Sequence, residues 1–147
     1  MQRPEIDVHR LLERISALGE IGRVDGPKGE WGNARLALSD DDRRGRDLVV
    51  SWMRDLGMSV SIDGVGNAVG TFPGSEPDLA PVMMGSHIDT VRTGGRFDGN
   101  LGVLAGLEVV EAVQRAGLTP RRSLQVDRKS TRLNSSHVAL SRMPSSA

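Results

Sequence analysis

The sequence contains no cysteine, and aromatic side chains make up only 3% of its 147 residues. Without cysteine, disulfide bonds and zinc sites built from thiolates are excluded. No apolar run approaches the roughly 20 residues that a membrane-spanning helix needs, and no basic-then-apolar leader opens the sequence. We therefore expect a cytoplasmic protein without a membrane partner, long enough for one domain with its own core.

No charge of one sign dominates, because 19 lysines and arginines balance 19 aspartates and glutamates. The two signs are unevenly distributed along the chain. Residues 127–147 hold four of the bases and one of the acids, which leaves 15 bases and 18 acids in residues 1–126. A slightly acidic body offers no extended basic surface, so we expect no nucleic-acid partner.

The composition changes at residue 127. Residues 127–137 (DRKSTRLNSSH) resemble the translation of a sequencing-library adapter, and residues 141–147 (SRMPSSA) resemble a later part of the same adapter. A serine-rich disordered tail is the alternative interpretation. We predict that residues 127–147 are a non-native, disordered tail and that the native protein sequence is truncated at about residue 126.

Apolar periodicity predicts three helices, over residues 8–18, 40–56 and 101–113, with Ser39 as the N-cap of the second. Short strands are predicted at residues 59–62 and 68–72, at the apolar run 81–84 that leads to His87, and from residue 123 onward, and the first two are expected to form a hairpin. The order strand, helix, strand after residue 81 predicts a parallel crossover. The fold class is therefore α/β, with a mixed sheet flanked by helices, and we expect an exposed sheet edge at the strand that begins at Ser123.

Residues 22–38 have no period and contain glycines and Pro27, which predicts a long loop. Within it, Trp31 and Arg35 could face a substrate, or the loop could be solvated with one packed indole. The acidic residues 40–42 fit helix capping better than a metal cluster, because consecutive carboxylates on one turn point apart.

A histidine and two aspartates follow the short apolar run at residues 81–84. His87 and Asp89 come at the end of the predicted strand, and a glycine-rich turn leads to Asp98 before the next helix. Ligands in open α/β sheets bind beyond the carboxyl ends of the strands. Imidazole suits zinc, manganese, cobalt or nickel, and a carboxylate can span the roughly 3.5–4 Å between two ions.

We interpret His87 as a metal ligand, Asp98 as a bridging ligand, and Asp89 as the residue that accepts from the second imidazole nitrogen and orients the ring. Two simpler interpretations stay open. A histidine at a strand end can be hydrogen-bonded to a carboxylate without binding any metal, and Asp98 can be the N-cap of the following helix.

Residues 85–90 (GSHIDT) and 94–106 (GGRFDGNLGVLAG) resemble the signature of the hydantoinase/carbamoylase family of amidases. That family includes N-carbamoyl-L-amino-acid hydrolases, allantoate amidohydrolases and ureidoglycolate-type relatives. Residues 35–40 (RLALSD) and 66–67 (GN) are similar to the same family, and the likeness runs from about residue 7 to residue 126. The spacing of eleven positions between His87 and Asp98 favours this branch over the related aminoacylases and dipeptidases.

The resemblance implies a binuclear metal-dependent hydrolase that acts on carbon–nitrogen bonds of N-carbamoyl amino acids or allantoate-like ureido compounds. It implies that His87 and Asp98 bind two divalent ions (Zn, Mn, Co or Ni) and that Asp89 orients His87. Residues 1–126 would be the N-terminal portion of the catalytic domain. The family's Glu-Glu pair, two further histidines and dimerisation domain would lie beyond them, so we expect the 147-residue chain to be inactive.

Two alternative functions remain. The first is an aminoacylase or dipeptidase of the related metallopeptidase superfamily. The second is a noncatalytic α/β binding module in which His87, Asp89 and Asp98 are structural. Metal content and the preference for N-carbamoyl over N-acetyl amino acids would distinguish the three.

Overall fold

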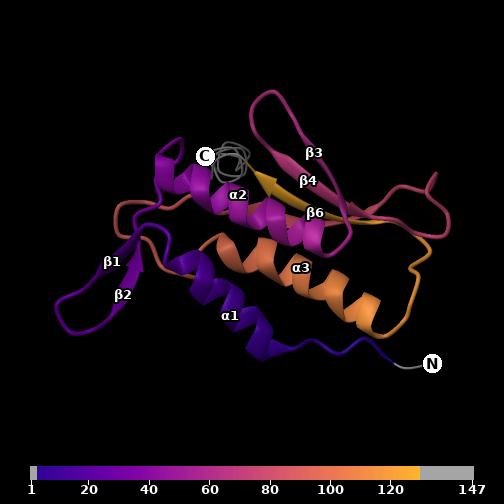
Figure 1. Cartoon of the computed structure of the whole chain (residues 1–147), viewed down its shortest axis with the longest axis horizontal. Coiled ribbons are helices and arrows are strands. Elements are labelled where there is room, and N and C mark those ends of the chain that lie inside the picture. Colours follow the sequence, from indigo (N-terminus) through magenta and orange to yellow (C-terminus); the bar gives the residue numbers. More distant parts are fainter. Residues whose placement is uncertain (1–2, 130–147) are drawn as a thin grey trace, which may run out of the picture.

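The computed structural model describes residues 3–129. Within them, a four-stranded mixed sheet with strand order β3-β4-β6-β5 carries three helices, and a separate two-stranded hairpin extends from one end (Figure 1). The elements in chain order are α1 (Val8–Gly19), β1 (Arg23–Asp25), β2 (Trp31–Asn33), α2 (Asp40–Asp55), β3 (Ser59–Ile62), β4 (Ala68–Phe72), β5 (Val82–His87), α3 (Asn100–Arg115) and β6 (Leu124–Lys129).

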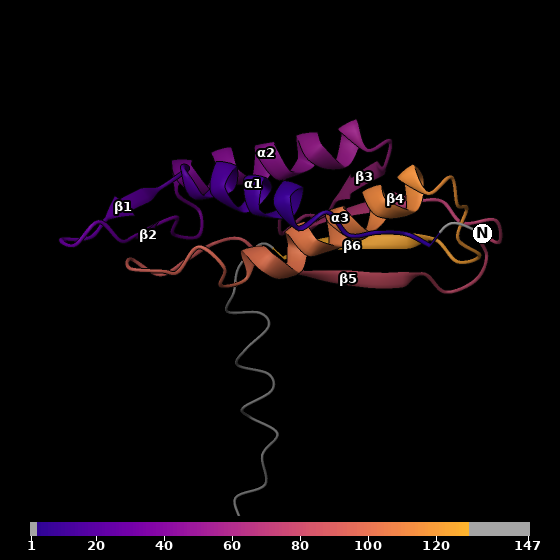
Figure 2. The same cartoon turned by 90° about the horizontal axis from the view of Figure 1, so that it is seen from below.

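All three helices lie on the same side of the sheet (Figure 2). Gly70 of β4 and Val126 of β6 are paired across the ladder, so they face the same side. A Cβ on Gly70 would meet Met53 of α2, and Val126 lies against Gly106 of α3. Helix α2 therefore covers β3 and β4, α3 covers β6 and β5, and α1 packs on α3.

The predicted helices, the β3–β4 hairpin and the parallel crossover are confirmed. Ser39 caps α2 by accepting from the amide of Asp42, and β5 pairs with β6 in parallel through α3. The hairpin turn is held by Asp63, whose carboxylate accepts from the amides of Val65 and Asn67. These features follow from local periodicity and turn chemistry.

The prediction of a structureless loop over residues 22–38 is wrong, because that segment contains the β1–β2 hairpin. Its two strands pair antiparallel over three residues each, from Arg23 opposite Asn33 to Asp25 opposite Trp31. Asn33 is also bridged to Gly94 through two backbone hydrogen bonds of 2.9 Å. A strand this short has too few residues to show a period, and part of its pairing comes from a segment 61 positions away.

The prediction of a sheet edge at the strand that begins at Ser123 is also wrong. β6 lies in the interior of the sheet, antiparallel to β4 on one side and parallel to β5 on the other, and β3 and β5 are the edges. The local sequence pattern predicted only one neighbour of β6, the parallel strand β5. The return of β4 to pair with β6 is a long-range event without a sequence signature.

β6 continues through Lys129, so the first three residues of the segment interpreted as an adapter lie in the sheet. Arg128 lies on the same face of β6 as Leu124 and Val126, because the three occupy alternate positions, and like them it is buried. This burial lowers the pKa of the Arg128 guanidinium. The rest of that segment, residues 130–147, lies outside the described residues, and its interpretation stays a prediction. No helix within residues 3–129 has the length and apolar character needed to cross a membrane.

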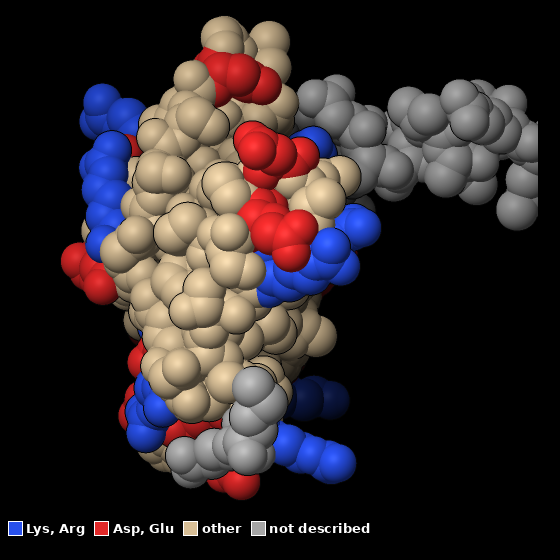
Figure 3. All heavy atoms as spheres, turned by 90° about the vertical axis from the view of Figure 1, so that its right-hand side faces the viewer, with Lys and Arg blue, Asp and Glu red and all other residues tan. Residues whose placement is uncertain are grey.

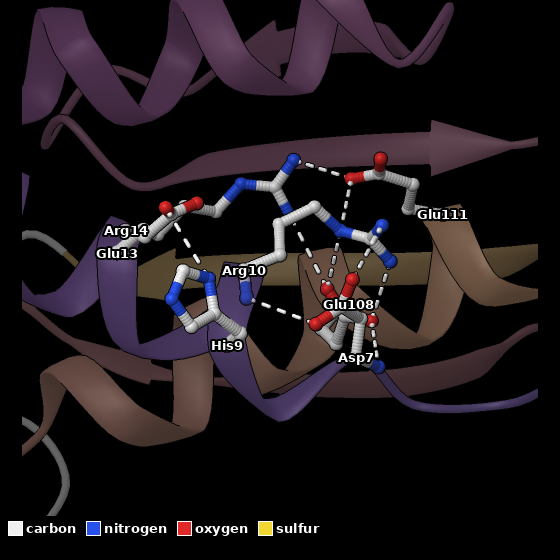
Figure 4. A network of polar contacts seen from close by, with 7 residues as sticks. All are labelled: Asp7, His9, Arg10, Glu13, Arg14, Glu108 and Glu111. Atoms are coloured by element: carbon white, nitrogen blue, oxygen red, sulfur yellow. Dashed lines mark hydrogen bonds and ion pairs between the residues drawn. The ribbon is translucent and has the colours of Figure 1, made fainter.

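A network of ion pairs joins α1 to α3 (Figure 4). Glu108 is fully buried on α3 and accepts from Arg10 through both carboxylate oxygens, at 2.9 Å from Nε and 2.6 Å from Nη2. The backbone amide of Asp7 also donates to Glu108, and Arg14 donates to Glu111. This bidentate geometry fixes the angle at which the first helix lies on the third.

We expect Glu108→Ala to lower the free energy of unfolding by about 3 kcal/mol, because it leaves the arginines of this network without their buried partner. Urea denaturation followed by circular dichroism would measure the change. The matched control is Glu76→Ala, which removes an exposed pair with Arg121 and should leave stability nearly unchanged. Equal effects of the two substitutions would contradict a structural role for the network.

Candidate functional site

His87 is the last residue of β5, at the point where the carboxyl end of the strand meets the amino end of α3. The residue is 8% exposed, and the three residues that follow it are buried as well. The chain then makes an irregular excursion over residues 91–99 and enters α3 at Asn100. The topology therefore puts the sequence-predicted site at the edge of the sheet where ligands bind in open α/β folds.

Asp89 holds one side of the His87 ring. Nδ1 of His87 lies 3.0 Å from the backbone oxygen of Asp89 and 3.4 Å from its Oδ1. The side-chain hydrogen bond to Asp89 raises the pKa of His87, with a smaller contribution from the charge of Asp98. Because Nδ1 is engaged by Asp89, Nε2 is the ring nitrogen through which His87 can bind a cation.

Gly99 fixes the other side of the ring. Its φ of +72° belongs to the left-handed region, and a Cβ at this position would lie 2.6 Å from both Nδ1 and Nε2 of His87. The glycine backbone is therefore packed directly against the imidazole. Asp98 precedes it, has an exposed side chain, and is near enough for its charge to act on His87.

Asp98 is not the N-cap of α3. Gly99 occupies that position, and as a glycine it makes no capping hydrogen bond through a side chain. The structure thus brings His87 and Asp89 into contact, and it places Asp98 directly before Gly99, whose backbone packs against the same ring. No group of three or more histidine, aspartate or glutamate side chains with metal-binding geometry occurs within residues 3–129.

Arg35 neither faces a substrate nor lies in a solvated loop; it is fully buried. Its guanidinium donates to the backbone oxygens of Leu18, Ile21 and Ile88, and to Oδ1 of Asn100. Burial lowers the pKa of Arg35 to about 10, so it remains a cation at neutral pH. A long arginine in an irregular segment gives no sequence signal that its end is buried.

Trp31 is half-buried, and two arginine side chains pack against its ring. The guanidinium carbons of Arg23 and Arg96 lie 4.4 and 4.1 Å from its ring centroid. A Cβ on Gly19 would lie 2.9 Å from the indole, so the ring also contacts the end of α1. The β1–β2 hairpin is thus attached to the glycine-rich loop by a cation–π contact through Arg96.

Two hollows on the described surface lie far from His87. One of about 400 Å³ is lined by residues that include Ser59, Thr71 and Pro81, at the starts of β3 and β5 and the end of β4. Since β5 is six residues long, this hollow is about 20 Å from His87. The surface at this end of the molecule is largely uncharged, with charged side chains around its margins (Figure 3). The other, of about 550 Å³, adjoins Ala112 and Ala116 at the far end of α3.

We expect Gly99→Ala to displace the His87 ring and to lower stability by about 1–2 kcal/mol, because alanine is strained in the left-handed region. Imidazole resonances in NMR spectra and urea denaturation would measure the two effects. Gly95→Ala is the matched control, since nothing lies within 4 Å of a Cβ there and its backbone is not left-handed. A Gly99→Ala chain with native imidazole shifts would show that the ring does not depend on this contact.

No protein-family model matches the sequence. Among curated proteins, the chain is 45% identical over 126 residues to an N-carbamoyl-L-amino-acid amidohydrolase of Pseudomonas sp. (strain NS671), covering 86% of this chain and 30% of the relative. It is 41% identical over 92 residues to a ureidoglycolate hydrolase of Oryza sativa subsp. japonica, covering 63% of this chain and 19% of the relative.

Solved structures agree. A hydantoinase/carbamoylase family amidase from Burkholderia ambifaria superposes with a TM-score of 0.79 at 48% identity, covering 86% of this chain and 30% of that one. A putative zinc-dependent exopeptidase from Bacteroides vulgatus shares the fold alone, with a TM-score of 0.59 at 15% identity over 87% of this chain and 48% of that one. The chain spans about 30% of the Pseudomonas relative and of the Burkholderia structure. By sequence and by fold, it belongs to the hydantoinase/carbamoylase family of amidases.

Proposed function

We propose that the whole protein is a metal-dependent amidohydrolase that cleaves carbon–nitrogen bonds of N-carbamoyl amino acids or related ureido compounds. The observation that carries the proposal is the His87 ring at the end of β5, held through Nδ1 by Asp89 and packed on Gly99, which Asp98 directly precedes. The substrate class is supported by the names of the relatives, which hydrolyse N-carbamoyl amino acids or ureidoglycolate.

The donor set fits part of a divalent-metal site. An imidazole with one nitrogen engaged by a carboxylate is a typical zinc or manganese ligand, and the exposed Asp98 carboxylate has the chemistry of a bridging one. Two ligands are too few to hold two ions. We therefore assign the remaining ligands and the general base to parts of the whole protein outside this chain, and we expect the 147-residue chain to turn over no substrate.

Each of the three residues has a defined task. Asp89 keeps the His87 ring in the tautomer that exposes Nε2, and its buried position resists rotation of the imidazole. Asp98 contributes negative charge near enough to raise the pKa of His87. Divalent ions bound there would supply a water molecule whose pKa is lowered towards about 7, the nucleophile that an unactivated C–N bond requires. We propose two such ions, and a homodimer whose contacts lie outside this chain.

A chimera tests the proposal. Residues 1–126 of this chain would replace the matching segment of the Pseudomonas amidohydrolase, and the product would be assayed on N-carbamoyl-L-amino acids with metal content measured by mass spectrometry. We expect hydrolysis and two divalent ions per chain. Asp89→Asn should reduce metal affinity or activity by about 10–100-fold, because the ring loses its orienting carboxylate. His87→Ala and Asp98→Asn should each abolish activity and lower the metal content.

The matched control is His9→Ala, which removes an exposed histidine of α1 that pairs with Glu13 and should leave both measurements unchanged. Preference for N-acetyl over N-carbamoyl substrates would favour the aminoacylase alternative. A folded chimera without bound metal would favour the noncatalytic module. Turnover by the 147-residue chain at a rate comparable to the chimera would contradict the assignment of the missing ligands.

A further inference from the structure

The segment that separates His87 from Asp98 is held at both ends by one guanidinium. Nε of Arg35 donates to the backbone oxygen of Ile88, the residue after His87, at 3.0 Å. Nη2 of Arg35 donates to Oδ1 of Asn100, two residues after Asp98, at 3.1 Å. A single planar group therefore connects the start and the end of this excursion of the chain.

The same guanidinium is fixed to the body of the molecule. Nη1 of Arg35 donates to the backbone oxygens of Leu18 and Ile21, at 2.8 and 2.7 Å, where α1 ends. A cation at this position also complements the negative end of the helix dipole. The hydrogen bonds of Arg35 thus hold both ends of the segment 88–100 in fixed positions relative to the end of α1. They also couple the two ends to each other.

Backbone contacts beside Arg35 reinforce the attachment. The amide of Arg35 donates to Oγ1 of Thr90 at 2.8 Å, and the amide of Thr90 donates to the carbonyl of Arg35 at 2.7 Å. On the far side, Nδ2 of Asn100 donates to the backbone oxygen of Arg96 at 2.8 Å. The side-chain amide of Asn100 therefore connects Arg35 to the backbone of Arg96, in the loop just before Asp98.

A buried cation of this kind is costly for stability alone. Among the described residues, the hydrogen bonds of the Arg35 guanidinium all go to neutral carbonyl and amide oxygens. The charges of Asp42, Asp41 and Asp89 offset only part of the desolvation, because the pKa of Arg35 is still lowered. What arginine supplies here is a rigid fork whose donors point in several directions at once, which lysine cannot reproduce. These directed hydrogen bonds fix the positions of the backbone segments next to the candidate site.

We infer that Arg35 is a positioning residue that sets the separation of His87 and Asp98, and thereby the geometry with which this loop receives a divalent cation. The inference rests on the proposed function for the role of the cation. Arg35 itself touches neither the His87 ring nor the Asp98 carboxylate in any contact described above. It acts through Ile88 and Asn100.

The test uses NMR on the 147-residue chain without metal. The Gly99 α-proton that occupies the Cβ position points at the His87 ring, so a nuclear Overhauser effect between it and the ring protons reports their contact. We expect this signal in the wild-type chain and its loss in Arg35→Met. Asn100→Ala removes the arm of the clamp nearest Asp98 together with the hydrogen bond that relays it to the backbone oxygen of Arg96, and we expect the same loss there with a smaller effect on stability.

Arg10→Met is the matched control, because it removes another largely buried arginine that binds α1 to α3 far from this loop. We expect it to lower stability and to keep the signal. Restoration by Arg35→Lys would contradict the need for a planar fork. The inference would be overturned if the Gly99–His87 Overhauser effect were as strong in Arg35→Met and Asn100→Ala as in Arg10→Met. If Arg35→Met does not fold, the comparison of Asn100→Ala with Arg10→Met decides.

Titration with Mn²⁺ separates this inference from the proposed function. In the wild-type chain, paramagnetic broadening should affect His87 and the amides around Asp98 together, whereas in Asn100→Ala the broadening around Asp98 should fall behind that of His87. Wild-type broadening confined to other carboxylates would contradict the proposed metal site. If Mn²⁺ broadens His87 and the amides around Asp98 together in the wild-type chain and equally in Asn100→Ala, the proposed metal site stands. That result would contradict only the role of Arg35.

Discussion

The guanidinium of Arg35 is the constraint on which the arrangement of this end of the molecule depends. It satisfies carbonyl groups at the end of α1, at the end of β5 and, through Asn100, at the start of α3. A buried carbonyl left without a donor costs about 1–3 kcal/mol. Removing this one side chain would therefore weaken the polar contacts of three elements at once. Three elements from distant parts of the sequence are thereby held at fixed relative positions.

The sheet supplies the platform for that constraint. β6 lies between β4 and β5, and the helices cover one face, so α3 is fixed by Val126 and Met84 packed against Gly106. The absence of a side chain at Gly106 allows the helix to approach the strands closely. Because α3 begins where β5 ends, its first residues and His87 share the same edge of the sheet, and the ion pairs of Glu108 hold its middle against α1.

The chemistry of the candidate site follows from how little freedom its residues have. Asp89 occupies one nitrogen of His87, and the backbone of Gly99 packs against the ring. The imidazole is therefore oriented before any ligand arrives, which is what a metal ligand in a hydrolase requires. Asp98 is exposed and directly precedes Gly99, and in the function we propose, these residues would supply part of a metal site whose remaining ligands lie outside this chain.

Local residue patterns were enough to predict the three helices, the β3–β4 hairpin, the β5–α3–β6 crossover and the motif around His87, because burial of one face leaves a local period and turns require particular residues. The family signature was also present in the sequence and placed the chain among the amidases. Three features became known from the folded molecule alone: β6 is interior, β1 and β2 pair, and Arg35 is buried. Strand pairing across more than fifty positions, and the destination of a long flexible side chain, depend on which surfaces meet in three dimensions, and no local pattern of residues encodes that.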